Sequence, residues 1–254
     1  MNATLNQVQL TSLDPAIVLL DVEELPPEMA VSTLPRGQGD GAVVTKSQRT
    51  ALRVRLKMEI HQPDMARRKA ACAKVAAWAG GGGSLTVSDR PGQCLDVRCE
   101  ELPVLTSALN WTQPVTVTLC ARDFPYWRAS RAATANSAAS ANHAITLHPA
   151  GSAAEVTLEV QIRNASAQTV NALTVTTPCS TFALEALALA PGELLEIREE
   201  AGAVVIAAGG LSKLWCRAPQ SSDRLLVKSG AENAISVTAD AAVEVSVSAR
   251  GAHF

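Results

Sequence analysis

The chain has 254 residues, of which 47% are hydrophobic, 18% are charged and 3% are aromatic, and its formal net charge is −2. This apolar content excludes a wholly disordered chain, and the length favours two domains. The near-neutral charge gives no overall attraction to nucleic acid or to an anionic membrane, so neither is expected as a direct partner. With so few aromatic rings, we expect thin β-branched core layers, which are typical of packed sheets.

The charges are unevenly distributed near the N-terminus. No Lys, Arg or His precedes Arg36, whereas acidic residues occur from Asp14 to Glu28, and the balance reverses over residues 46–74. One interpretation is a pair of solvated faces. The other is head-to-tail complementarity between copies of the chain.

The first ten residues carry no positive charge and no sustained apolar block, so the sequence predicts no secretory signal and a cytosolic origin. The six cysteines are therefore expected to be reduced and to act as small core residues. The sequence contains no C-x-x-C pair, H-E-x-x-H motif or G-x-S-x-G elbow. We accordingly expect no metal, no cofactor and no catalytic residues.

The first half of the chain predicts strands around a single helix. Alternation over residues 52–61 predicts a strand with one wet face, and Pro63 and Asp64 precede a helix expected over 64–79. Residues 84–101 predict a hairpin around Arg90-Pro91-Gly92-Gln93, and the alternation around Val117 predicts a further strand. The four glycines from Gly80 follow the helix rather than precede it, so they indicate a helix stop and not a phosphate cradle.

Residues 130–142 consist mainly of Ala, Ser, Thr and Asn without an apolar period, which predicts a linker open to proteolysis between domains 1–129 and 143–254. The aromatic cluster at residues 123–127 is interpreted either as a strand end packed on the core or as a plug between the domains. Beyond the linker, short alternating segments separated by turns predict an antiparallel β-sandwich.

The order of these elements resembles that of the distal tail proteins of long-tailed bacteriophages. The resemblance is carried by the alternating strand 52–60, by the helix that ends in Trp78-Ala79-Gly80, and by the hairpin that begins at Ser84. Phe124-Pro125-Tyr126-Trp127 is similar to the domain exit of that family. The second half resembles its galectin-like C-terminal sandwich at three places, namely Gly151-Ser152-Ala153, Pro191-Gly192-Glu193 and the segment from Ser229 to Asn233.

The resemblance implies a mainly β protein with a tail-tube-like N-terminal β-sandwich that carries one helix, followed by a galectin-like sandwich. It also implies a structural virion protein, made in the host cytoplasm, that forms a hexameric ring at the distal end of the tail. The implied partners are the tail tube protein and the tail-tip hub protein, with the tape-measure protein and receptor-binding proteins nearby.

We hypothesise that Glu23 and Glu24 meet Arg53, Arg55 or Lys57 of the adjacent subunit, because a closed ring needs two unlike patches. The alternative is that this basic face lines the channel or meets solvent. A carbohydrate-binding or adhesive module and an enzyme accessory domain remain open as other functions. A sugar site would be sparse in aromatic residues, since the second half offers only Phe182, Trp215 and Phe254.

Overall fold

The computed structural model describes residues 1–36, 40, 42–104, 112–152, 155–200 and 202–254. The chain is mainly β and forms two compact units, unit 1 from Met1 to Trp127 and unit 2 from Arg128 to Phe254. Each unit is described by itself, and β9 (Trp127–Ala129) carries the chain from one to the other. Among the described residues, no helix is both long and apolar enough to span a bilayer.

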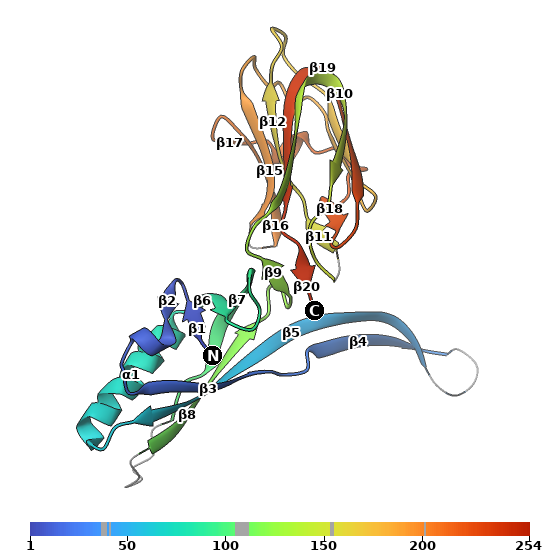
Figure 1. Cartoon of the computed structure of the whole chain (residues 1–254). Helices are drawn as coiled ribbons and strands as arrows, with labels where there is room; N and C mark the ends of the chain where they lie inside the picture. The colour runs from blue at the N-terminus through green and yellow to red at the C-terminus, as the bar shows by residue number, and fades with distance from the viewer. Residues whose placement is uncertain (37–39, 41, 105–111, 153–154, 201) are drawn as a thin grey trace. The chain divides into compact units, whose positions relative to one another are not determined.

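Unit 1 is built on an antiparallel sheet with the strand order β2-β1-β6-β7-β8-β5-β3 (Figure 1). Strand β4 continues it as the partner of the N-terminal half of β5. The strands are β1 (Ala3–Leu5), β2 (Val8–Gln9), β3 (Ile17–Glu24), β4 (Glu28–Pro35), β5 (Ala42–His61), β6 (Gly83–Val87), β7 (Gln93–Glu101) and β8 (Thr112–Ala121), with a short 3-10 helix at Leu10–Ser12.

Helix α1 (Met65–Gly80) covers one face of this sheet, close to the predicted range of 64–79. Asp64 caps its N-terminus, because the carboxylate accepts hydrogen bonds from the amides of Ala66 at 2.7 Å and Arg67 at 3.4 Å. The buried stripe of the helix includes Cys72 and Val75, which join the inward side chains of β5, β7 and β8 in one hydrophobic core.

The predicted hairpin is confirmed as β6 and β7, in which Leu85 lies opposite Leu95. Its turn closes with a hydrogen bond from the amide of Gln93 to the carbonyl of Arg90. Gly92, at the third turn position, has a φ of +75°, which L-residues with a side chain rarely adopt. The turn residues thus specify the hairpin as the sequence indicated.

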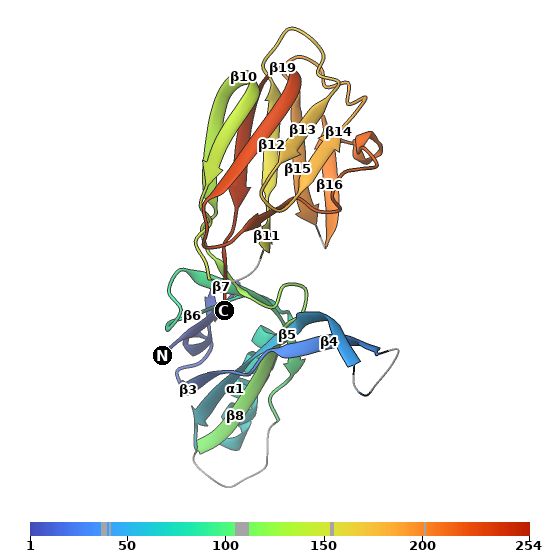
Figure 2. The same cartoon turned by 90° about the vertical axis from the view of Figure 1, so that its right-hand side faces the viewer.

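Unit 2 is an antiparallel β-sandwich (Figure 2). Its main sheet has the order β14-β13-β19-β12-β15-β16-β17, β10 pairs with β19, and β11 pairs with β18. The elements are β10 (Ala133–Leu147), β11 (Glu155–Thr157), β12 (Glu159–Asn164), β13 (Leu173–Thr176), β14 (Thr181–Leu184), β15 (Leu194–Glu200), β16 (Ala203–Ala208), β17 (Leu211–Ser212), a 3-10 helix at Leu214–Cys216, β18 (Leu226–Lys228), β19 (Asn233–Ala249) and β20 (Ala252–His253).

The two long strands β10 and β19 run side by side through both layers of the sandwich. The first part of β19 pairs with β13 and its second part pairs with β12, and the register of β10 shifts between Ser137 and Asn142, where the pairing changes. His143 is buried at this bend and contacts the Ser137 hydroxyl at 2.8 Å and the Ser140 carbonyl at 2.9 Å. The bend thus keeps its polar groups hydrogen-bonded.

The prediction of a linker at residues 130–142 is wrong, because most of this segment forms the first half of β10. Backbone pairing with β19 holds it, from Ala133 opposite Ala249 to Ser140 opposite Val243. A ladder of backbone hydrogen bonds does not require apolar side chains on both strands, and here β19 supplies the buried valines. Small Ala and Ser side chains on β10 therefore hide a strand from a search for apolar alternation.

Candidate assembly surface

Strand β5 positions the residues that the sequence singled out. Its C-terminal half alternates as predicted, with side chains such as Leu56 buried in the core and Arg53, Arg55 and Lys57 on the opposite face. Its N-terminal half leaves the core and pairs only with β4. One strand thus carries both a charged face and a projecting ribbon.

The charged face is neutralised within the chain. Strand β3 runs antiparallel to β5, with Glu23 opposite Arg55 and Asp21 opposite Lys57. Lys57 lies 3.0 Å from the Glu23 carboxylate and 3.5 Å from that of Asp21, and Arg55 lies 3.3 Å from Glu23. Lys57 and, less strongly, Arg55 lower the pKa of Glu23, while Glu23 raises the pKa of Lys57. The basic stripe read from the sequence is therefore not a net basic patch.

Arg53 is the centre of a second group of ion pairs. Its guanidinium contacts the carboxylates of Glu28 and Glu100, and Arg122 also lies 2.8 Å from Glu100. The contact with Arg53 holds the pKa of Glu100 at about 2, with a smaller contribution from Arg122. Glu100 and Glu28 in turn raise the pKa of Arg53. This group ties β4, β5 and β7 together at the base of the ribbon.

Glu24 does not join the other predicted residues. Its carboxylate lies 2.8 Å from Arg90 and accepts a hydrogen bond of 3.0 Å from the indole nitrogen of Trp127. Trp127 is itself buried in the core of unit 1, which favours the interpretation of the aromatic cluster as a strand end packed on the core.

The structure thus brings Glu23 close to Arg55 and Lys57, and gives Glu24 and Arg53 other partners. All these contacts lie within one chain, so pairing between subunits remains a prediction. Glu100 and Arg122 were missed because the pairing of β7 with β8 and of β8 with β5 brings these distant charges to Arg53. Arg90 was missed because it lies in the turn between β6 and β7 and contacts Glu24 of β3, which is far away in the sequence.

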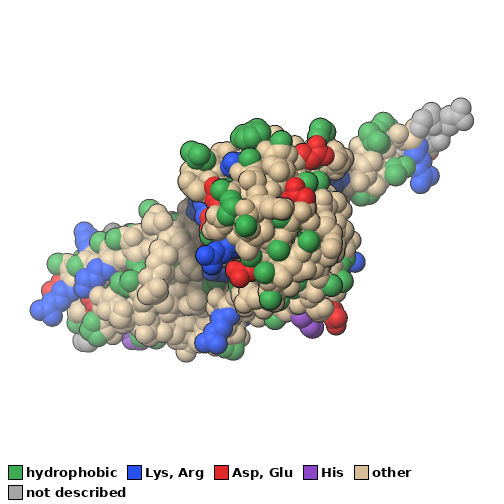
Figure 3. Space-filling view, turned by 90° about the horizontal axis from the view of Figure 1, so that it is seen from above, with side chains coloured by type: hydrophobic (Ala, Val, Ile, Leu, Met, Phe, Trp, Pro, Cys, Tyr) green, Lys and Arg blue, Asp and Glu red, His purple; other side chains and the backbone are tan. Residues whose placement is uncertain are grey.

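The ribbon formed by β4 and the first half of β5 carries several exposed apolar side chains. The side chains of β4 and of the first half of β5 are exposed over most of the ribbon. Figure 3 shows hydrophobic side chains along the ribbon. The exposed apolar residues are Met29, Val31, Leu34, Val43 and Val44, each between 50% and 61% exposed. A two-stranded ribbon is marginally stable in water by itself. This one carries exposed apolar side chains on both faces, since Val43 and Val44 are neighbours on β5 and point to opposite sides.

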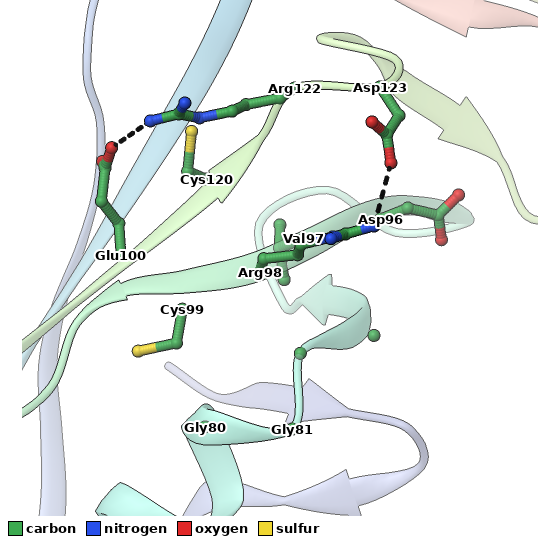
Figure 4. Close-up of a pocket in the computed structure, with 12 residues that line it drawn as sticks. Gly80, Gly81, Asp96, Val97, Arg98, Cys99, Glu100, Cys120, Arg122 and Asp123 are labelled. Carbon is green, nitrogen blue, oxygen red and sulfur yellow. Dashed lines mark hydrogen bonds and ion pairs between the residues drawn. The ribbon is translucent and has the colours of Figure 1, made fainter. Parts of the chain in front are cut away.

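The glycine run lines a polar pocket of about 880 Å³ between the end of α1, β7 and β8 (Figure 4). Gly82 and Gly83 have φ values of +60° and +128°, and a side chain at Gly82 would meet the carbonyl of Val97. Ion pairs between Arg122 and Glu100 and between Arg98 and Asp123 lie along the pocket. The glycines follow the helix, so no helix N-terminus faces this pocket, as phosphate binding would require.

Within the described part of the chain, no three His, Cys, Asp or Glu side chains lie together as a metal site would require. The six cysteines are free thiols, four of them buried and two, Cys99 and Cys179, half-buried. Asn164 is buried, and its side-chain amide donates to the carbonyls of Gln168 and Leu189.

Comparison of the sequence with protein-family models and with curated proteins finds no match. The structure does have a counterpart among solved structures: the chain shares the fold of phage tail-hub proteins, with both units included.

The similarity is to the crystal structure of SPP1 Dit (gp 19.1), described as a paradigm of the hub adsorption apparatus in phages that infect Gram-positive bacteria. The TM-score is 0.72 over 98% of both chains, at 12% sequence identity. A weaker similarity, with a TM-score of 0.47 and 7% identity over 92% of this chain and 90% of the other, links it to the phage p2 baseplate in its activated conformation. The similarity to SPP1 Dit confirms the distal-tail fold expected from the sequence.

Proposed function

We propose that the protein is a structural component of a phage tail tip, forming a ring that joins the tail tube to the host-adsorption hub. The observation that carries this function is the match of the complete two-unit fold to SPP1 Dit, over 98% of each chain. A match across both units, in order, is more specific than a match to one sandwich, because single sandwiches serve many functions. On this account the protein is not an enzyme and it works in the virion.

The projecting ribbon supports self-assembly. Five large apolar side chains lie exposed on a ribbon that has no third strand or helix to cover it among the described residues. Burial against a neighbouring copy would remove this apolar area from water. A heterologous contact of this kind closes into a ring when an integer number of identical rotations between subunits adds up to one full turn. Six subunits are the number that the distal tail family implies.

The charged residues of the inter-subunit hypothesis would fix the alignment of neighbouring subunits and would add little to the free energy of association. They are Glu23, Glu24, Arg53, Arg55 and Lys57. Since Glu23 already pairs with Arg55 and Lys57, a contact between subunits would require these groups to exchange or share partners. Exposed ion pairs contribute only about 0.2–1 kcal/mol each, so their exchange costs little. The proposed neighbours above and below the ring are the tail tube protein and the tail-tip hub protein, with the tape-measure protein and receptor-binding proteins close by.

Negative-stain electron microscopy with light scattering tests this function on the purified chain. We expect ring-shaped particles with a central hole and a mass that is a fixed multiple of 26.5 kDa. A monomer at all protein concentrations, without ring particles, would refute the ring. The carbohydrate-binding alternative is favoured by one separate feature of unit 2, a polar groove, and this is developed below.

A further inference from the structure

A shallow groove of about 350 Å³ lies on the outward face of the unit 2 sheet, across β10, β19, β12 and the start of β15. The antiparallel register arranges its polar side chains in two rows. Asn136, Ser246 and Gln161 lie opposite one another in the first row. Glu244 and Arg163 form the second row, and Leu194 lies next to Arg163 on β15. Strand spacing makes this patch about 10 Å by 7 Å.

Four polar side chains of the groove have no partner among the described residues, whereas Gln161 contacts Glu196 and Ser137 contacts His143. Arg163 and Glu244 are exposed and directly opposite each other, yet they form no ion pair with each other or with any other described residue. The equivalent cross-strand pair of Arg55 and Glu23 in unit 1 does form one, at 3.3 Å. The side chains of Asn136 and Ser246 likewise make no hydrogen bond to the described residues.

The chemistry of these groups selects the kind of ligand. A guanidinium donates several hydrogen bonds, a carboxylate accepts several, and an amide does both. An anionic ligand would be repelled by Glu244, and a cationic one by Arg163. A neutral molecule with adjacent hydroxyl groups satisfies both, because each hydroxyl donates and accepts. Leu194, 42% exposed, offers an apolar contact for the carbon face of a ring.

We propose that this groove is a binding site for a neutral saccharide, with Glu244, Arg163 and Asn136 as its hydrogen-bonding residues. A pyranose unit or a disaccharide matches the size of the patch. The groove has no aromatic ring on which a sugar could stack, so each site binds weakly, with a Kd of roughly 1–10 mM. Repetition of the site around an oligomer would raise the apparent affinity for a polysaccharide surface.

Saturation-transfer difference NMR on the full chain tests this site, since the method reports weak binding to a monomer and to a large assembly alike. The probes are methyl glucopyranoside, methyl galactopyranoside, N-acetylglucosamine and N-acetylgalactosamine, each titrated to about 50 mM. We expect saturation transfer to at least one probe. The Glu244→Gln and Asn136→Ala variants should each weaken that probe's binding by about tenfold, since each removes hydrogen bonds to the ligand.

Glu159→Gln is the matched control. Glu159 lies on the same strand as Gln161 and Arg163, is exposed on the same face and lies outside the groove. This variant should bind like the unaltered chain, and all three variants should keep its thermal midpoint. Failure of all four probes to bind would overturn the proposal, as would binding that survives Glu244→Gln. Displacement of the sugar by inorganic phosphate would overturn the assignment to a neutral ligand. None of these outcomes bears on ring assembly, which is measured separately.

Discussion

Assembly through the projecting ribbon predicts that two small changes will weaken the oligomer without unfolding the subunit. In the double variant Val31→Thr and Val44→Thr, a methyl group of each valine is replaced by a hydroxyl of nearly the same size. Threonine is as compatible with a strand as valine. Because Val31 is 54% exposed and Val44 is 59% exposed, the isolated subunit should lose little stability.

The two substitutions should instead weaken the contact between subunits. Burial of one methyl group contributes about 0.8 kcal/mol, and about half of it is still exposed in the isolated subunit, so its loss costs the contact about 0.4 kcal/mol at each site. A hydroxyl buried without a partner adds about 1 kcal/mol or more at each site. The two substitutions together should therefore weaken each contact by about 3 kcal/mol, or roughly a hundredfold in the association constant.

Sedimentation velocity over a range of protein concentrations measures this effect. Val104→Thr is the control, because it makes the same chemical change at an exposed valine of unit 1 outside the ribbon. The control should assemble like the unaltered chain, whereas the double variant should dissociate at much higher concentrations. If the double variant assembles normally, the ribbon does not form the contact between subunits.

Three further predictions concern the stability of each unit. Asn233→Ala should lower the free energy of unfolding of unit 2 by about 3 kcal/mol, because the buried amide donates to two carbonyls at 2.9 Å and accepts from the amide of Lys228; calorimetry should show a much smaller effect for the exposed Asn171→Ala. Arg53 lowers the folded-state pKa of Glu100, so unit 1 should lose about 1 kcal/mol as the pH falls from 4.5 to about 2, and Glu100→Gln should remove that part of the pH dependence in denaturant titrations. Asp64→Ala should cost unit 1 about 1 kcal/mol in the same titrations, whereas Asp64→Asn should cost much less, because asparagine also caps helices.

Local patterns predicted the elements that local chemistry determines. The alternation from Leu52 to Ile60 and the Asp64 cap both depend on neighbours in sequence, and both are confirmed. The turn at Gly92 is specified by the φ it needs, and the hairpin follows from it. These features could be predicted from local sequence alone, without knowing which distant segments pair with them.

Long-range pairing was beyond a reading of the sequence. The first half of β10 is a strand because β19 lies beside it, not because of its own Ala and Ser side chains. The partner of Arg53 on β7 depends on the spatial order β7-β8-β5, which no spacing in the chain reveals. The groove at Glu244 and Arg163 was missed for the same reason, since its residues come from four strands.

The most direct test of a tail-tip function is the position of the protein in the virion. Gold-labelled antibodies against the chain, applied to intact particles of the phage that encodes it, should label the distal end of the tail. Labelling should be restricted to that end, because a ring adaptor occupies one level of the tail. Labelling along the tail tube or on the capsid, or an absence of the chain from purified particles, would contradict the account.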